Sequence, residues 1–211
     1  MLESFQSWLR ERKYGEPVII VSGLPRSGTS MMMKMLDGAG LSIMTDQVRQ
    51  ADVDNPKGYY EFERVKDLEK EEKAGEDRAW VREARGKVLK VISFLIKSLP
   101  DENFYRIIFM RRDLGEVLAS QNKMLVHRGE ENPADDKTMS EAYLNHLAAV
   151  RILVRKRPNM EILEVFYDQT IADPKATAQA VNTFLGGRLD VAAMVQAVDA
   201  ELYRNRKGKT V

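Results

Sequence analysis

The sequence predicts an α/β fold with three layers, α/β/α, in which a central parallel sheet lies between helices. Three observations predict it. Short apolar runs alternate with longer amphipathic segments. The first apolar run leads directly into a glycine-rich turn that opens a helix. No repeat or flexible linker divides the chain, so a single domain is expected over residues 1–211. Strands that alternate with helices favour a parallel sheet covered on both faces.

The predicted strands are apolar runs rich in branched and aromatic residues, and turn signals bound them. The run at 41–44 is the weakest of them, because only a short stretch between polar segments is available. In chain order the candidates are Pro17–Val21, Leu41–Met44, Lys87–Ser93, Tyr105–Met110 and Met160–Phe166.

The predicted helices have apolar residues at helical spacing and recognisable ends. Asp113 and Asp190 are suited to cap the helices that follow them. Pro174 stands at a first helical position, where a missing N–H costs nothing. In chain order the helices are expected at Met1–Arg10, Ser30–Asp37, Glu61–Lys73, Asp113–His127, Ser140–Lys156, Pro174–Leu185 and Val191–Leu202, and Glu76–Arg85 is ambiguous.

Composition excludes several classes of protein. A net charge of +1 over 211 residues gives no broad basic surface for nucleic acid. No apolar run approaches the roughly 20 residues that span a bilayer, so stable membrane insertion is not expected. The absence of cysteine excludes disulfides and thiolate metal sites, and together with an N-terminus unlike a signal peptide it fits a cytoplasmic protein. The sequence carries no signal for the oligomeric state.

A phosphate-binding loop is predicted at Gly23–Ser30, directly after the first strand. Backbone N–H groups of such a turn and the positive end of the helix dipole converge on an anion. The spacing is that of a Walker A P-loop, G-x-x-x-x-G-K-[ST], except that Thr29 stands in the lysine position. The basic residue of this loop is Arg26. The loop therefore predicts a P-loop fold like that of nucleotide kinases, with a phosphate-containing ligand other than ATP or GTP.

A second anion site is predicted where the strand at 105–110 meets the next helix. Arg111 and Arg112 follow that strand, at the same edge of the sheet as the phosphate-binding loop. Arginine suits phosphate because its fork donates two hydrogen bonds. Ser120 lies eight residues after Arg112, which is about 12 Å along a continuous helix. Both can face one anion only if the chain turns sharply, and the turn is expected at Leu114–Gly115.

The segments Pro25–Ser30 and Arg112–Ser120 together resemble the two cofactor signatures of sulfotransferases. In that family the first loop binds the 5′-phosphosulfate of 3′-phosphoadenosine 5′-phosphosulfate (PAPS), and an arginine and a serine bind its 3′-phosphate. The resemblance implies that PAPS is the sulfuryl donor. The cofactor-binding residues that it implies are Arg26, Ser27, Gly28, Thr29, Ser30, Arg112 and Ser120.

The resemblance covers most of the chain. It includes Asn55–Glu61, which is similar to a segment of bacterial sulfotransferases, and Tyr167–Pro174. The chain departs from the family pattern at three places. Leu114 replaces a proline that often follows Arg-Asp, and Arg206–Gly208 only echoes a C-terminal motif of cytosolic members, so no cofactor role is assigned to it. Arg26 replaces the lysine of cytosolic members, as in many bacterial and Golgi-type relatives.

Sulfuryl transfer needs a cation at the leaving phosphate oxygen and a group that removes a proton from the acceptor. Arg26 is assigned the first role. The resemblance to Golgi-type members favours a carboxylate as the base, and Glu61 is the first choice, with Asp54 and Glu63 as rivals. Lys90 is a further candidate for contact with the phosphosulfate. The sequence offers no clustered metal-ligand spacing, so no metal is expected.

Other interpretations stay open. The chain is alternatively a small-molecule kinase on the same fold, or a nucleotide-binding module without catalysis. Glu61 is alternatively a residue that opens a helix, where the helix dipole favours a negative charge. His127 and His146 are expected to be structural or exposed. The acceptor is expected to be a small molecule, a glycan or a lipid, and nothing in the sequence chooses among these.

Overall fold

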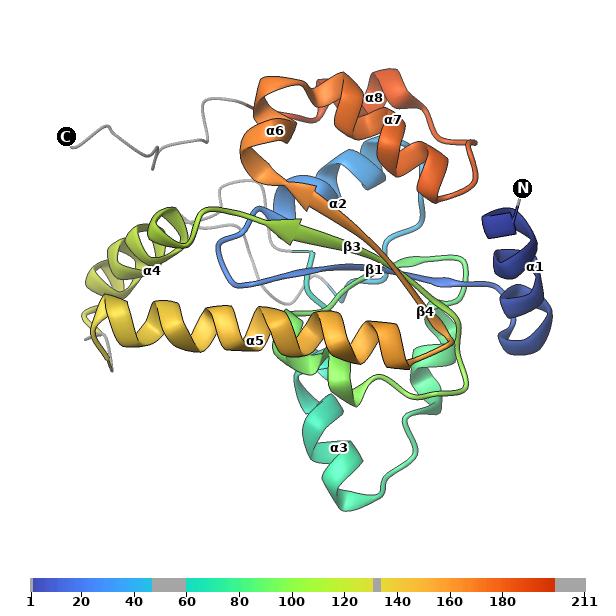
Figure 1. The fold of residues 1–211 in the computed structure, drawn as a ribbon, viewed down its shortest axis with the longest axis horizontal. Helices are drawn as coiled ribbons and strands as arrows, with labels where there is room; N and C mark the ends of the chain where they lie inside the picture. Colours follow the sequence, from blue (N-terminus) through green and yellow to red (C-terminus); the bar gives the residue numbers. More distant parts are fainter. Residues whose placement is uncertain (1, 47–59, 131–133, 200–211) are drawn as a thin grey trace.

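The computed structural model describes residues 2–46, 60–130 and 134–199. Its centre is a sheet of four parallel strands in the order β2-β1-β3-β4. In Figure 1 the arrowheads of β3 and β4 point to the left, so the carboxyl ends of the strands gather on that side. The predicted parallel α/β sheet is confirmed. The strands are β1 Val18–Gly23, β2 Val88–Lys90, β3 Tyr105–Arg111 and β4 Met160–Phe166.

Helices cover both faces of the sheet and enclose two apolar cores (Figure 1). One face carries α2 Thr29–Gly38, α6 Tyr167–Ala172, α7 Pro174–Phe184 and α8 Val191–Gln196. The other face carries α3 Leu68–Ala74, α5 Asp136–Lys156 and the 3-10 helices η1 Glu63–Asp67, η2 Ala79–Ala84 and η3 Ser93–Ser98. The helix α1 Leu2–Tyr14 lies outside these layers. The helix α4 Leu114–Arg128 lies at the carboxyl ends of the strands and contributes Val117 and Leu118 to the core on the α5 face.

Aspartates fix the beginnings of several helices, as the sequence predicts. The carboxylate of Asp113 accepts a hydrogen bond from the N–H of Glu116, and Asp190 accepts one from Ala193. Asp173 caps α7, whose first residue is Pro174. These side chains satisfy N–H groups that have no partner inside the helix.

Several segments differ from the sequence prediction, among them the last helix, which ends at Gln196 and not at Leu202, and α6, which was not predicted. Residues 41–44 do not form a strand. Only Ile43 pairs, in a single parallel bridge with Val88. The ambiguous segment 76–85 holds the 3-10 helix η2, and the predicted helix 61–73 begins only at Glu63 and divides into η1 and α3. The strand β2 is shorter than predicted and ends at Lys90. Residues 55–59 of the segment that resembles bacterial sulfotransferases, Asp54, the motif at 206–208 and Leu202 lie outside the described residues.

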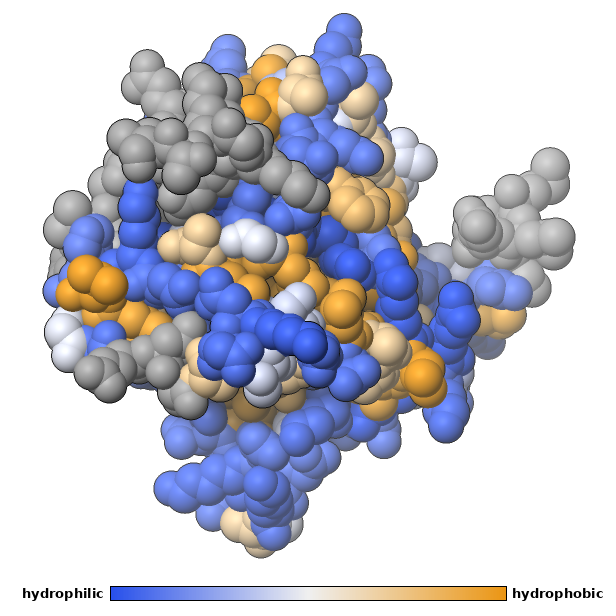
Figure 2. All heavy atoms as spheres, turned by 60° about the vertical axis from the view of Figure 1, so that its left-hand side comes forward, coloured by the Kyte–Doolittle hydropathy of each residue, from blue (hydrophilic) through white to orange (hydrophobic). Residues whose placement is uncertain are grey.

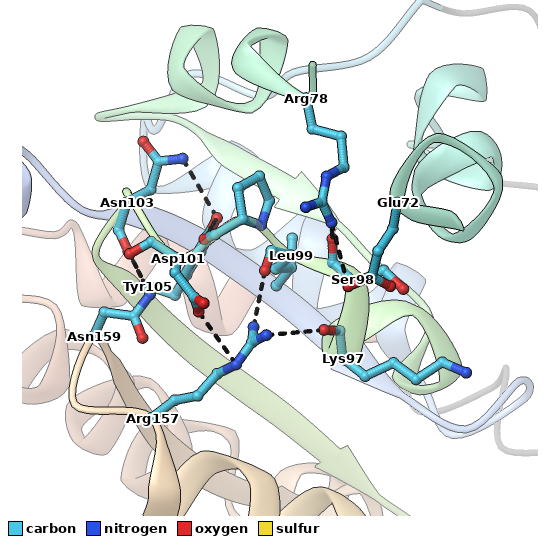
Figure 3. Close-up of polar contacts among 11 residues, drawn as sticks. Glu72, Arg78, Lys97, Ser98, Leu99, Asp101, Asn103, Tyr105, Arg157 and Asn159 are labelled. Atoms are coloured by element: carbon cyan, nitrogen blue, oxygen red, sulfur yellow. Dashed lines mark hydrogen bonds and ion pairs between the residues drawn. The ribbon is translucent and has the colours of Figure 1, made fainter. Parts of the chain in front are cut away.

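Side chains hold the connection that leads from η3 to β3 at the amino end of the sheet (Figure 3). The guanidinium of Arg157 donates to the carbonyl oxygens of Leu99 at 2.8 Å and Lys97 at 3.1 Å. Arg78 donates to the carbonyl oxygen of Ser98 at 2.6 Å. The hydroxyl of Tyr105 donates to the carbonyl oxygen of Pro100 at 2.8 Å. These bonds satisfy backbone groups that the loop would otherwise leave without partners.

Candidate active site

The loop between β1 and α2 has an unusual backbone. Arg26 adopts a φ of 68°, in the left-handed region that a side chain disfavours. Gly28 precedes the first turn of α2 with a φ of 99°. A Cβ at Gly28 would lie 2.4 Å from Cδ2 of Tyr167, so only glycine fits against that ring. Such left-handed residues cluster at ligand-binding loops.

The interior of this loop presents groups that suit an anion. The hydroxyl of Ser27 is buried, and within the described part of the chain it has no hydrogen-bond partner. A buried polar group without a partner costs about 1–3 kcal/mol, so an oxygen from a ligand would relieve that cost. Thr29 and Ser30 form the first turn of α2, where backbone N–H groups and the helix dipole favour negative charge. These residues therefore form a suitable site for a phosphate-like anion.

The structure brings the two predicted signatures into direct contact. Nε of Arg26 lies 3.0 Å from Oγ of Ser120, which is on α4. Nη1 of Arg112 donates to the backbone carbonyl of Arg26 at 3.2 Å. The predicted turn at Leu114–Gly115 is wrong in position, because α4 runs without a break from Leu114. The chain turns instead at Asp113, whose extended backbone (φ −52°, ψ 131°) leads from β3 into the helix.

The guanidinium of Arg112 is held on several sides. Its Nε pairs with a carboxylate oxygen of Glu116 at 3.0 Å, and both side chains are at least nine-tenths buried. Its central carbon, Cζ, lies 4.5 Å from the centre of the Tyr167 ring, within the range of a cation–π contact. Arg111 faces a different partner, since its Nη1 lies 3.2 Å from Glu164 on β4. Of the two adjacent arginines, Arg112 is thus the one that joins the loop.

The predicted base reaches the loop through a lysine. Oε1 of Glu61 lies 3.7 Å from Nζ of Lys90, the last residue of β2. The same Nζ lies 3.3 Å from Oγ of Ser30, in the first turn of α2. Lys66 approaches the other oxygen of the Glu61 carboxylate at 3.8 Å. Glu61 precedes η1 and is not in a helix, so a helix-opening role does not explain this residue.

Lys90 brings an ammonium group to the α2 N-terminus, where the loop itself lacks the Walker lysine. Its side chain is 9% exposed. Sequence reasoning named Lys90 without assigning it, because only the parallel pairing of β2 with β1 shows that its side chain reaches Ser30. The Arg112–Glu116 pair was missed, although its i,i+4 spacing is a signal that the sequence carries. The contact of Tyr167 with Gly28 has no such signal.

Among the described residues, no helix is long and apolar enough to cross a membrane. Within the same ranges, no group of three or more histidine and acidic side chains is arranged to hold a metal ion.

Comparison with known proteins identifies the family. The sulfotransferase family model matches residues 71–190. The sulfotransferase domain of the olefin synthase of Synechococcus PCC 7002 superimposes with a TM-score of 0.53 at 16% identity, over 90% of this chain and 79% of that one. The sulfotransferase domain of the curacin biosynthetic pathway gives 0.52 at 12% identity, over 87% and 78%. No curated protein sequence matches. With more than half of its length in that match, the chain belongs to the sulfotransferase family.

Proposed function

We propose that this protein transfers a sulfuryl group from PAPS to a hydroxyl or amine of an acceptor. Family membership supports sulfuryl transfer as the general chemistry. The observation that carries the choice of donor is the contact of Arg26 with both Ser120 and Arg112. It makes one continuous polar surface from two anion-binding segments, as a ligand with phosphate groups at two ends requires.

The binding roles follow from position. The backbone N–H groups at Gly28, Thr29 and Ser30 and the hydroxyl of Ser27 would hold the 5′-phosphosulfate. Arg112 and Ser120 would hold the 3′-phosphate, with Glu116 and Tyr167 fixing the direction of the guanidinium. A charged hydrogen bond of this kind contributes about 1.5–3 kcal/mol.

The reactive groups lie around the N-terminus of α2. When bound, PAPS supplies the sulfuryl group and the leaving phosphate. Lys90 places a cation beside this helix end, and Arg26 would supply a second from the loop that precedes the helix; both would stabilise negative charge on an oxygen. A unit charge pair at about 4 Å is worth roughly 4 kcal/mol at an effective dielectric constant near 20. The Glu61 carboxylate, 3.7 Å from Lys90, accepts the proton of the acceptor. These roles use no metal ion.

Ligand-dependent melting tests the donor. The desulfated product 3′-phosphoadenosine 5′-phosphate (PAP) should raise the melting temperature, whereas ATP with Mg²⁺ should not, because a ligand stabilises only the state that binds it. Incubation with PAPS and a mixed acceptor panel should then release PAP and label an acceptor. Stabilisation by ATP with Mg²⁺ alone would support the kinase alternative. Stabilisation by PAP without any transfer would support a binding module.

A further inference from the structure

The rim of the sheet beside Lys90 is apolar. Ile92 and Phe94 follow this lysine by two and four residues, and they are 42% and 39% exposed. Most other large apolar side chains near the end of β2 are buried, including Val91 and Leu95. Figure 2 turns the carboxyl-end side of the sheet forward and shows apolar residues gathered there with hydrophilic residues around them.

The backbone places Ile92 on the same side as Lys90. The N–H of Val91 donates to the carbonyl oxygen of Val21 at 3.0 Å, so the chain stays paired with β1 past the end of β2. Ile92 is also extended, with a ψ of 147°. Side chains alternate between the faces of an extended chain. Val91 belongs to the core under α5, so Lys90 and Ile92 both project toward α2.

Phe94, two residues further along the chain, lies against α5. Its ring stacks on the imidazole of His146, with centroids 4.0 Å apart and planes 17° apart. Tyr143 lies against it at 6.4 Å in a tilted arrangement. Burial lowers the pKa of His146 and raises that of Tyr143, so both side chains are neutral near neutral pH. The rim therefore presents rings without charge.

The polar atoms of this rim bond one another. Nε2 of His146 lies 2.9 Å from Oγ of Ser93, and the hydroxyl of Tyr143 donates to Oε1 of Gln121 at 2.7 Å. Gln121 follows Ser120, the partner of Arg26. A saccharide needs hydrogen-bonding groups turned toward it. Here those groups bond to each other, and Phe94 and Ile92 are large apolar side chains exposed beside them in the described part of the chain.

From this arrangement, which rests on the proposed function, we propose that the acceptor is an alcohol or phenol with an apolar body. Its hydroxyl lies toward Glu61 and Lys90, and its hydrocarbon part covers Ile92 and Phe94. These two residues are then determinants of acceptor specificity. In the transfer, the acceptor oxygen forms the new O–S bond, the O–S bond to the phosphate of PAPS breaks, and the acceptor proton passes to Glu61.

Calorimetric titration of the full chain, saturated with PAP, tests this assignment without turnover. Wild-type protein should bind naphthol at least about tenfold more tightly than methyl glucoside. Ile92→Ser and Phe94→Ser should each weaken naphthol binding about tenfold, which is roughly 1.4 kcal/mol of lost apolar contact. Phe94→Leu should restore most of it. Ile152→Ser is the matched control, because Ile152 is 53% exposed on α5 and stands apart from the rim contacts.

Two results would overturn the assignment: equal affinity for naphthol and the glucoside, or naphthol binding that Ile92→Ser and Phe94→Ser leave unchanged. All variants should melt within a few degrees of the wild type, since both side chains are already partly exposed. If naphthol binds as expected but PAPS never yields a sulfated product, the proposed function fails while the apolar acceptor site stands. If glycans are sulfated instead, the function stands and the acceptor assignment fails.

Discussion

Nε of Arg26 donates a hydrogen bond to Oγ of Ser120 across 94 residues of sequence, at 3.0 Å. One partner lies in the loop after β1 and the other on α4, after β3. These strands are neighbours in the sheet, and their carboxyl ends meet at the same rim. The contact therefore depends on parallel pairing and on the turn at Asp113, and it makes one site from two local motifs.

Arg112→Ala should weaken the binding of PAP by about 1.5–3 kcal/mol, through loss of a charged hydrogen bond. Affinity for the same cofactor without its 3′-phosphate should stay nearly unchanged. The single variant also leaves the buried Glu116 carboxylate without its partner, so it should melt at a lower temperature. Titration calorimetry measures the affinities.

The double variant Arg112→Ala/Glu116→Gln separates these two effects. It removes the unpaired charge and should recover much of the stability, but not the affinity. Arg111→Ala is the matched control, since Arg111 pairs with Glu164 away from the loop. An equal loss of affinity for both cofactors would refute the assigned role of Arg112.

Glu61→Gln should lower kcat by about 10²–10⁴-fold, the usual contribution of a positioned base. Affinity for PAP should change little, because the amide keeps the size of the side chain. Glu63→Gln is the control: its carboxylate is 40% exposed and pairs with Lys66. Steady-state kinetics with a saturating acceptor gives the comparison. A wild-type kcat in Glu61→Gln would show that another group takes the proton.

Lys90→Met should reduce kcat by about tenfold or more, because a cation next to the α2 N-terminus is lost where charge develops. Lys66→Met should have a small effect. Both lysines approach the carboxylate of Glu61 at similar distances, 3.7 and 3.8 Å, but Lys66 is 57% exposed and solvent screens its charge. Similar kinetics in the two variants would mean that Lys90 only neutralises Glu61.

Arg157→Ala should lower the free energy of unfolding by about 1–3 kcal/mol, because the carbonyl of the buried Leu99 loses its charged donor. For a chain of this length, the melting temperature should fall by roughly 2–4 °C per kcal/mol. The binding of PAP should be unaffected, since this network lies at the amino end of the sheet (Figure 3). Urea denaturation measures the change. Weakened binding of PAP would contradict the expectation that the amino end of the sheet does not affect the binding site at its carboxyl end.

The stability of the protein should fall with acid partly because of His146. Burial and the nearby Lys97 lower its pKa from the ordinary 6.5. Below that pH the unfolded chain binds a proton that the folded state resists, so the free energy of unfolding decreases as the pH falls. His146→Gln should make the dependence shallower between about pH 7 and pH 5. The urea midpoint, measured across this pH range, reports the pH dependence of stability. If the dependence is unchanged in His146→Gln, groups other than His146 cause the loss of stability in acid.

Much of the fold could be predicted because local chemistry determines it. β4 and the start of α7 at Pro174 match the prediction, since an apolar run and a proline act within their own segment. The early end of β2 could not be predicted. The branched residues after Lys90, Val91 and Ile92, fit a longer strand as well as they fit a segment that leaves the sheet. Residues 61–62 were expected to begin a charged helix, yet they lie outside any helix, and Phe62 is extended before η1.

The candidate site could be predicted only in part, for a related reason. The loop, Arg112 and Ser120 stand out because each follows an apolar run at a fixed spacing. Other residues can be assigned to the site only from their contacts in the folded protein; they are Lys90, Tyr167 and Glu116. Tyr167 touches both Gly28 and Arg112, which are far from it in sequence, so no local pattern could reveal it.

The left-handed backbone of Arg26 has a consequence for evolution and engineering. A non-glycine residue there carries a conformational penalty of about 1 kcal/mol or more, which glycine would remove. Selection or design for thermal robustness alone would therefore tend to erase the arginine and, with it, the cation that joins the two halves of the rim. At this position, a substitution that raises the stability of the protein is expected to lower its catalytic rate.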